Sequence, residues 1–411
     1  MKVLVLGGTR FVGRAFVELA VGHGHEVAVF HRSVSEPDDF PSVEHLHGDR
    51  DGQLGLLRGR SWDAVLDTCG YVPRVVREAT AVLRDVAGHY TLVSTLSVHP
   101  DDMPAGATER AALHQPPFPQ TETVTDQTYG PLKVACEYAA TTAFGDRCLI
   151  IRPGYIVGPH DPSDRFTFYV RRAAAGGEMA APGPPDAPVQ VIDVRDLAAF
   201  MLGRIEAAAG GVFGVVGPGE PIVMRDVLAT ARDAAAAHTT FTWLSQEFLE
   251  AAGDQAQQWF PLWEPQFPGV HTYDAAKAVA AGLRCRPLAD TRGRHPGLGP
   301  AARPARSAHR PERRNGNRTP HHLALATLTA QLPPIVTSGE LGRWSEFYLM
   351  VGDSIVVPFQ AVASDVWQVQ LAGADLERAG QYRVGPVLPF QPVRGRRDAQ
   401  QVARDLRIQM G

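Results

Sequence analysis

Apolar positions in the first 150 residues fall into short runs that alternate with amphipathic stretches. Five runs are strand-like, namely residues 2–6, 25–30, 43–47, 62–68 and 89–95. Stretches with helical spacing lie near residues 12–22, 71–86 and 126–144. Apolar strands that alternate with helices are typical of a parallel sheet covered on both faces. The pattern therefore predicts an α/β fold with a Rossmann-type, doubly wound parallel sheet.

From residue 147 the alternation of strand-like and helix-like segments becomes less regular. A further strand is predicted over 147–159, and short strands, Pro/Gly loops and helices near 194–207 and 224–237 follow. Ligands in doubly wound folds bind at the carboxyl edge of the sheet. We therefore expect an NAD(P)-binding domain over 1–150, completed by strand 147–158 and parts of the next segment. A smaller substrate lobe is expected over 151–290.

The composition changes sharply after about residue 290. Residues 291–322 are rich in Arg, Pro, Gly and His and contain one acidic residue. Such a segment buries too little apolar surface to offset the entropy of ordering, so we predict that it is disordered. Residues 323–411 include the strand-like patch DSIVVPFQAV but no motif that indicates a function. This tail is left unassigned.

Charge and cysteine content narrow the functional classes. The formal net charge is −4, which argues against a nucleic-acid partner. No apolar run approaches the ~18 residues of a membrane span, and the N-terminus lacks a signal-peptide pattern, so a cytoplasmic location is expected. The four cysteines show no metal or redox spacing. We expect reduced thiols and no metal site.

The glycine-rich segment KVLVLGGTRFVG follows the first strand. A G-x-x-G-x-x-G fingerprint has Gly7 and Gly13 in place, but Arg10 occupies the middle position. An arginine there can lie over a pyrophosphate and add charge to the helix N-terminus. A strand before and a helix after favour dinucleotide binding over a purely structural turn. The predicted cofactor-binding residues are Gly7, Gly8, Thr9, Arg10, Phe11, Val12 and Gly13.

Two further residues bear on the choice of cofactor. An acidic residue after the second strand would favour NAD, but the chain has Arg32 there. Arg32 could pair with a 2′-phosphate, so we expect NADP in preference to NAD. The alternative is a solvated loop arginine. Asp49, in HGDRDG, either meets the adenine edge or simply forms a turn.

Tyr129 and Lys133 form the candidate catalytic pair. At a spacing of four residues both lie on one face of a helix. An ammonium near a phenol lowers the phenol pKa, so Tyr129 could exchange a proton with a substrate oxygen. The segment TLVSTLSVH supplies Ser94, Thr95 and Ser97 at the end of the preceding strand. A hydroxyl is needed to hold the substrate oxygen. Because Thr95 lies just before SVH, we predict that it is the third catalytic residue, beside Tyr129 and Lys133.

Five ordered motifs, GGTRFVG, STLSV, YGPLK, RPGYIVGP and VQVIDVRDLA, resemble the extended short-chain dehydrogenase/reductase superfamily. The chain is most similar to the NAD-dependent epimerase/dehydratase family, over residues 1 to about 290. This resemblance implies that Tyr129 is the catalytic acid/base, that Lys133 anchors the nicotinamide ribose and that Thr95 assists. It also implies an NAD(P)-dependent oxidoreductase or epimerase that acts on a hydroxyl or keto group of a small, sugar-like molecule or secondary metabolite. A homodimer through the Tyr129 helix is a possible assembly.

The chain departs from that family in places. Arg10 resembles an atypical branch that includes chloroplast RNA-binding proteins. Val189 stands where many nucleotide-sugar enzymes carry an arginine that grips the diphosphate. Arg165, Arg171 and Arg172 could replace it or could form a solvated helix face. Residues 69–71 (Cys-Gly-Tyr), after the fourth predicted strand, should line the nicotinamide pocket. The alternative function is a non-catalytic nucleotide-sensing or RNA-binding protein of the same fold.

Family members end soon after the segment that resembles AAGLRCRPLADT, with a helix that carries a Leu-Ala-Trp-Asp core. In GC-rich codons residues 292–300 can be written CGG GGA CGC CAC CCT GGC CTG GGA CCG, and dropping the first base gives Gly-Asp-Ala-Thr-Leu-Ala-Trp-Asp. The same shift applied to ERRNGNRTPHHLA gives a segment like the family's closing one. We therefore hypothesise that the chain from about residue 291 is read out of frame and carries no evolved function. The alternative is a basic linker before a small extra domain.

Overall fold

The structure is a computed structural model. It describes residues 1–32, 40–217, 219–264, 267, 269–291, 347–351, 355–363 and 366–369. The chain divides into two compact units, Met1–Pro304 and Ala305–Gly411, which are described separately. The predicted disordered segment, except for Thr291, lies outside the described residues.

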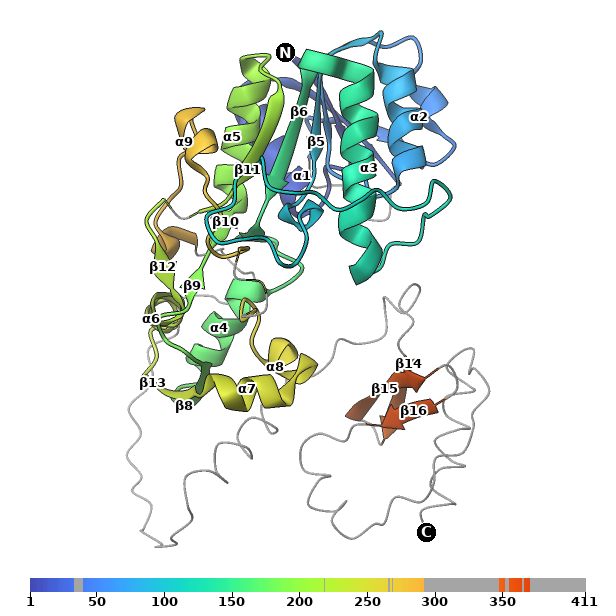
Figure 1. The fold of residues 1–411 in the computed structure, drawn as a ribbon. Helices are drawn as coiled ribbons and strands as arrows, with labels where there is room; N and C mark the ends of the chain where they lie inside the picture. Colours follow the sequence, from blue (N-terminus) through green and yellow to red (C-terminus); the bar gives the residue numbers. More distant parts are fainter. Residues whose placement is uncertain are drawn as a thin grey trace, which may run out of the picture. The chain divides into compact units, whose positions relative to one another are not determined.

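A seven-stranded parallel sheet forms the centre of the first unit (Figure 1). Its strands are β1 (Lys2–Leu6), β2 (Glu26–His31), β3 (Glu44–His47), β4 (Trp62–Asp67), β5 (Ala87–Val93), β6 (Cys148–Pro153) and β11 (Gly211–Val215). Their order is β11-β6-β5-β4-β1-β2-β3, which confirms the predicted α/β, doubly wound fold. The order reverses between β1 and β4, and ligands bind at such a switch point.

Helices cover both faces of the sheet (Figure 1). Helices α1 (Phe11–Gly22) and α5 (Val194–Glu206) lie on one face, and α2 (Pro73–Leu83) and α3 (Asp126–Phe144) on the other. Val3 and Val5 of β1 pack toward α1 and α5, whereas Leu4 and Leu6 pack toward α2 and α3. Burial on both faces explains why β1 reads as one continuous apolar run.

The strand predicted over 147–159 is two strands. Gly154 separates β6 from β7 (Tyr155–Val157), which pairs with β10 (Val191–Asp193) outside the main sheet. The remaining elements are α4 (Arg165–Ala174), β8 (Gly177–Pro182), β9 (Pro188–Val189), β12 (Ile222–Val223), α6 (Met224–Ala235), β13 (Thr239–Leu244), α7 (Gln246–Ala252), α8 (Asp254–Trp259) and α9 (Ala276–Ala280). In Figure 1, α4, α6, α7 and the β8–β13 pair lie beyond the lower ends of the strands, where β6 leads into β7.

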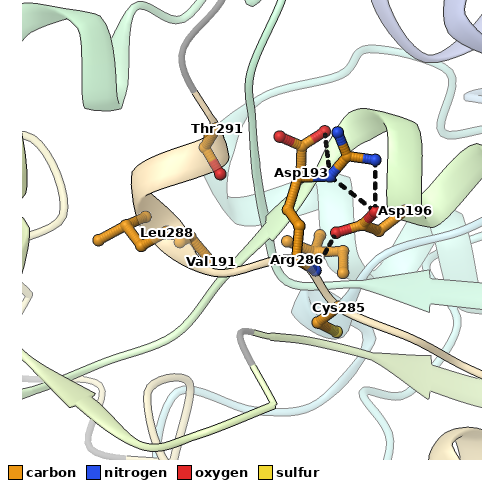
Figure 2. Close-up of a pocket in the computed structure, with 8 residues that line it drawn as sticks. Val191, Asp193, Asp196, Cys285, Arg286, Leu288 and Thr291 are labelled. Atoms are coloured by element: carbon orange, nitrogen blue, oxygen red, sulfur yellow. Dashed lines mark hydrogen bonds and ion pairs between the residues drawn. The ribbon is translucent and has the colours of Figure 1, made fainter. Parts of the chain in front are cut away.

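The segment after α9 folds back onto the start of α5. Arg286 donates hydrogen bonds to Asp196 through its backbone N–H and its Nε, both at 2.8 Å, and also reaches Asp193 (Figure 2). The pocket beside this ion pair has room for about one water molecule, at about 10 Å³. Thr291, the last residue described in this unit, is buried and lines the pocket. The Arg286 contacts therefore hold the segment after α9 against the start of α5.

In the second unit three antiparallel strands are described, β14 (Phe347–Val351), β15 (Ile355–Ala363) and β16 (Val366–Val369). Strand β15 includes most of the strand-like patch noted in the sequence. Among the helices that the structure describes, none is both long and apolar enough to cross a membrane.

Candidate active site

The turn after β1 needs glycine at three positions. Gly7 and Gly8 have φ angles of +100° and +91°, which side chains other than glycine rarely adopt. A Cβ on Gly7 would lie 2.3 Å from Oγ1 of Thr68, at the end of β4. A Cβ on Gly13 would lie 2.6 Å from the Cα of Gly8, so α1 packs directly on the turn.

This strand–turn–helix fits a dinucleotide diphosphate. Arg10 is the exposed N-cap of α1 and its side chain makes no capping hydrogen bond, and the first-turn amides and the helix dipole favour an anion. Phe11 has a φ of +37°, a strained value for a non-glycine residue. Thr9 and Val12 are half-buried on either side. All seven predicted residues therefore lie in the turn after β1 and the first turn of α1, where the strand order reverses.

Arg32 and Asp49 lie together at the carboxyl ends of β2 and β3. The Arg32 guanidinium is 3.9 Å from Oδ2 of Asp49, and both side chains are exposed. Oδ1 of Asp49 accepts a hydrogen bond from the backbone N–H of Asp51 at 3.0 Å, so Asp49 does form a turn. A 2′-phosphate would have to compete with the Asp49 carboxylate for Arg32.

The start of α3 sets the position of Tyr129. Thr125 and Thr128 cap each other, with the Thr128 N–H donating to Oγ1 of Thr125 at 3.2 Å and the Thr125 N–H donating to Oγ1 of Thr128 at 2.8 Å. A Cβ on Gly130 would lie 2.0 Å from the backbone oxygen of Ser97. Glycine beside Tyr129 therefore lets α3 approach the turn that carries Thr95.

Lys133 is one turn further along α3 and is 2% exposed. Its ammonium donates hydrogen bonds to the backbone oxygens of Gly70, at 2.8 Å, and Val93, at 2.6 Å. Burial lowers the pKa of Lys133. An ammonium has three N–H donors. The two carbonyls use two of these donors. Among the contacts that the structure describes, the third donor is left for the hydroxyl of a ligand.

The Thr95 hydroxyl, which donates a hydrogen bond to Oγ of Ser97 at 3.1 Å, is close enough to Tyr129 to act on its phenol. Burial raises the pKa of Tyr129, while the Thr95 hydroxyl and the Arg165 guanidinium lower it in part. The net shift is upward, so the predicted lowering by Lys133 is wrong for this structure. The physical reason is that the phenol is desolvated and that the cation acting on it is Arg165.

Three hydroxyls were candidates for the partner of Tyr129. Ser94 donates to Oε1 of Glu137 at 2.5 Å, and Ser97 is exposed and accepts from Oγ1 of Thr95 at 3.1 Å. Of these three residues, Thr95 is the one whose hydroxyl acts on the Tyr129 phenol.

Tyr71 follows β4 and lies near both members of the pair. Its ring centroid is 5.4 Å from Nζ of Lys133 and 6.3 Å from the ring of Tyr129. Desolvation raises the pKa of Tyr71 to about 12, although the residue as a whole is 46% exposed. The structure therefore places Tyr71 against the predicted nicotinamide-ribose anchor.

A buried network behind this site was not predicted from the sequence. Arg50 donates to both carboxylate oxygens of Asp67, at 2.6 and 2.8 Å, and Tyr90 donates to Oδ2 at 2.7 Å. Burial would raise the pKa of Asp67, but the Arg50 charge and these hydrogen bonds keep it below its usual value. The network fixes the end of β4, three residues before the Gly70 carbonyl that binds Lys133.

A family model decides the classification. The model for the NAD dependent epimerase/dehydratase family matches residues 3–217, more than half of the 411 residues. The chain belongs to the NAD-dependent epimerase/dehydratase family. The matched region runs from β1 through β11 and includes the glycine-rich turn, Thr95, Tyr129 and Lys133.

Similar proteins differ in their described roles. A chloroplast stem-loop binding protein of 41 kDa from Arabidopsis thaliana is 28% identical over 250 residues, which cover 56% of this chain and 62% of the relative. The chain thus matches less than two thirds of that relative. An epimerase candidate from Burkholderia cenocepacia J2315 has a TM-score of 0.54 and 22% identity, covering 71% of this chain and 95% of its own. The UDP-glucuronic acid 4-epimerase of Bacillus cereus, solved with UDP-glucuronic acid and NAD, has a TM-score of 0.51 and 16% identity, with coverages of 71% and 96%. At these identities the two structures show the shared fold.

The segment predicted to form the substrate lobe contains Val189 and the three arginines singled out in the sequence. Val189 is buried in β9, so this position offers no cation. Arg171 is paired with Asp164 and partly exposed, whereas burial lowers the pKa of Arg172. Arg165 stacks at 5.1 Å over the Tyr155 ring. Of the three arginines, Arg165 is the one whose charge acts on Tyr129.

Proposed function

We propose that the protein is an NAD(P)-dependent oxidoreductase or epimerase that acts on a hydroxyl or keto group of a small, sugar-like molecule or secondary metabolite. The observation that carries the proposal is the convergence of Thr95, Tyr129 and Lys133 at the carboxyl edge of the sheet. Tyr129 meets Thr95, and the buried Lys133 ammonium keeps one donor for a ribose hydroxyl. Family membership supports the same class of chemistry.

In this mechanism a nicotinamide, when bound, supplies or accepts hydride. The turn Gly7–Gly13 holds the diphosphate, and Lys133 holds the ribose. Thr95 orients the substrate oxygen toward Tyr129. The Tyr129 hydroxyl gives its proton to that oxygen during reduction and takes it back during oxidation.

Cofactor binding is the first test. Calorimetric titration of the purified protein with NADH and NADPH should give one site per chain. A screen of hydroxyl and keto compounds, UDP-sugars included, should then show turnover by nicotinamide absorbance or by product analysis. A chain that binds neither dinucleotide would contradict the proposal.

A second candidate function is RNA binding without catalysis. The Arabidopsis relative, named for stem-loop binding, favours it. Anisotropy titration with a labelled stem-loop RNA separates the two functions. Tight RNA binding together with no turnover of any compound would favour this candidate.

We also propose NADP in preference to NAD, with Arg32 as the residue that selects it. Arg32→Ala should weaken NADPH binding by roughly 1.5–3 kcal/mol, because it removes a charge-assisted bond to the 2′-phosphate, and should leave NADH binding nearly unchanged. Titration with both cofactors measures the difference. Asp49→Asn is the matched variant and should strengthen NADPH binding, since it removes the competing carboxylate. Equal losses for both cofactors in Arg32→Ala would overturn this assignment.

A homodimer through α3 and a cytoplasmic location complete the proposal. Tyr138 lies on α3 and is 53% exposed, an aromatic side chain of the kind enriched in interfaces.

For the tail we propose that the chain is out of frame from about residue 291. Two solved structures are covered almost completely by 71% of this chain, and residues 1–291 make up the same share of its 411 residues. Resequencing the gene should reveal a single-base change near the codon for Arg292. Truncation after Thr291 should leave dinucleotide affinity unchanged, because every predicted site residue precedes it, while stability can fall. A verified gene that encodes RGRHPGLGP in frame would exclude the hypothesis.

A further inference from the structure

Two histidines and a glutamate gather at the amino-terminal edge of the main sheet. His23 and His25 lie in the turn between α1 and β2, and Glu206 is the last residue of α5. The helices run antiparallel to the strands, so α1 and α5 both end where β1 begins, at the edge that Figure 1 marks with N. This edge is opposite the one that carries Tyr129.

The three side chains converge through atoms that can bind a metal. Nε2 of His25 is 2.8 Å from Oε1 of Glu206, and Nδ1 of His23 is 3.4 Å from the same oxygen. All three ligand atoms lie within 4.8 Å of one another. Zinc bonds of 2.0–2.2 Å at tetrahedral angles place neighbouring ligand atoms about 3.3–3.5 Å apart. The separations therefore need only small side-chain adjustments to hold one ion.

We propose that His23, His25 and Glu206 bind a divalent borderline cation, Zn²⁺ in the first instance. Two imidazoles and one carboxylate are an established zinc donor set. The His23 and Glu206 side chains are 51% and 38% exposed, so water can complete the coordination.

The backbone presents the histidines in this arrangement. Gly24 has a φ of +80°, which allows the chain to reverse between them. The His25 N–H donates to the backbone oxygen of Ala20 at 3.0 Å, and the His25 side chain is only 11% exposed. The other ring nitrogen of His25, Nδ1, lies 3.3 Å from the N-terminal amine. A metal at Nε2 puts the remaining imidazole proton on Nδ1, so the ion must displace the hydrogen bond that the N-terminal amine donates to that nitrogen.

Such an ion would join the α1–β2 turn to the end of α5. Helices α1 and α5 already pack together on one face of the sheet. The site is a structural or regulatory one, because the sheet separates it from the catalytic edge. The proposal is independent of the function assigned to Tyr129.

The test is calorimetric titration of the full-length, untagged protein with ZnCl₂ after removal of metal by chelation. The wild type should bind one equivalent, and its melting temperature should rise with added Zn²⁺. His23→Ala and Glu206→Gln should each weaken binding at least tenfold and abolish the rise. Glu206→Gln keeps a hydrogen-bond acceptor for the histidines, so it separates metal binding from loss of the existing contacts.

Two control variants test whether Zn²⁺ binds at these three residues or at other histidines. His238→Ala removes an exposed histidine of the substrate lobe and should bind Zn²⁺ as the wild type does. His45→Ala tests a second histidine cluster, at the carboxyl end of β2, where Nδ1 of His45 lies 3.0 Å from Nε2 of His31. No binding by the wild type, or binding that survives Glu206→Gln and is lost in His45→Ala, would overturn the proposal.

Discussion

Tyr129→Phe is expected to reduce kcat by about 10²–10⁴-fold, the usual effect of removing one general acid/base. The phenol is the proton donor and acceptor in the proposed reaction, and phenylalanine has no proton to exchange. The ring remains, so the affinity for NADPH should stay within about twofold, because no predicted cofactor contact is lost. Initial rates with the compound identified by screening, together with a cofactor titration, measure both effects.

Tyr138→Phe is the control, since Tyr138 lies on the same helix and the variant removes only a hydroxyl, so the aromatic ring proposed for the dimer interface is kept. It should leave kcat and cofactor affinity unchanged. A Tyr129→Phe variant with wild-type turnover would remove Tyr129 from the mechanism.

The upward shift of the Tyr129 pKa has a consequence for pH dependence. Tyr129 carries its proton at neutral pH, which is the form that reduction requires. Oxidation requires the phenolate, so its rate should rise as the pH increases toward the Tyr129 pKa, whereas reduction should stay flat through neutrality. An oxidation rate that does not depend on pH between about 7 and 10 would argue against Tyr129 as the base.

The parts of the fold that follow from local pattern could be predicted from the sequence. Burial of β1 on both faces leaves an unbroken apolar run, and the left-handed φ angles at Gly7 and Gly8 require glycine. The helical spacing of Tyr129 and Lys133 is likewise local, so the pair could be proposed without a structure.

Features that depend on contacts between distant segments could not be predicted in this way. Arg50 reads as a loop residue in HGDRDG, yet its side chain is only 12% exposed and donates to both carboxylate oxygens of Asp67, 17 residues later. The effect of Arg165 on Tyr129 depends on where α4 packs. The break of β6 at Gly154 was missed because IIRPGYIV is apolar on both sides of it, although the dipeptide Pro153-Gly154 is a local turn signal.

The second large effect is expected at the buried ion pair between Glu137 and Arg152. Glu137 is one helical turn after Lys133 on α3, and Arg152 belongs to β6. Arg152 donates to both carboxylate oxygens of Glu137, at 3.0 and 2.7 Å. The Glu137 side chain is 6% exposed and the Arg152 side chain 4%. Ser94, adjacent to Thr95, donates to the same carboxylate. The pair therefore joins the catalytic helix to the strands that carry its partners.

Glu137→Gln should lower the free energy of unfolding by about 3–5 kcal/mol, because a near-isosteric amide leaves the Arg152 charge buried without compensation. Urea unfolding followed by circular dichroism measures this loss. Glu18→Gln, at an exposed ion pair with Arg14 on α1, should cost no more than about 1 kcal/mol.

The double variant Glu137→Leu/Arg152→Leu distinguishes a charge effect from a packing effect. Replacement of a whole buried ion pair by apolar side chains is often neutral or stabilising. The double variant should therefore recover most of the stability that Glu137→Gln loses. Its kcat should nevertheless stay below that of the wild type, because Ser94 loses its acceptor and α3 its polar connection to β6. A double variant less stable than Glu137→Gln would show that the site depends on the shape of these side chains and not on their charges.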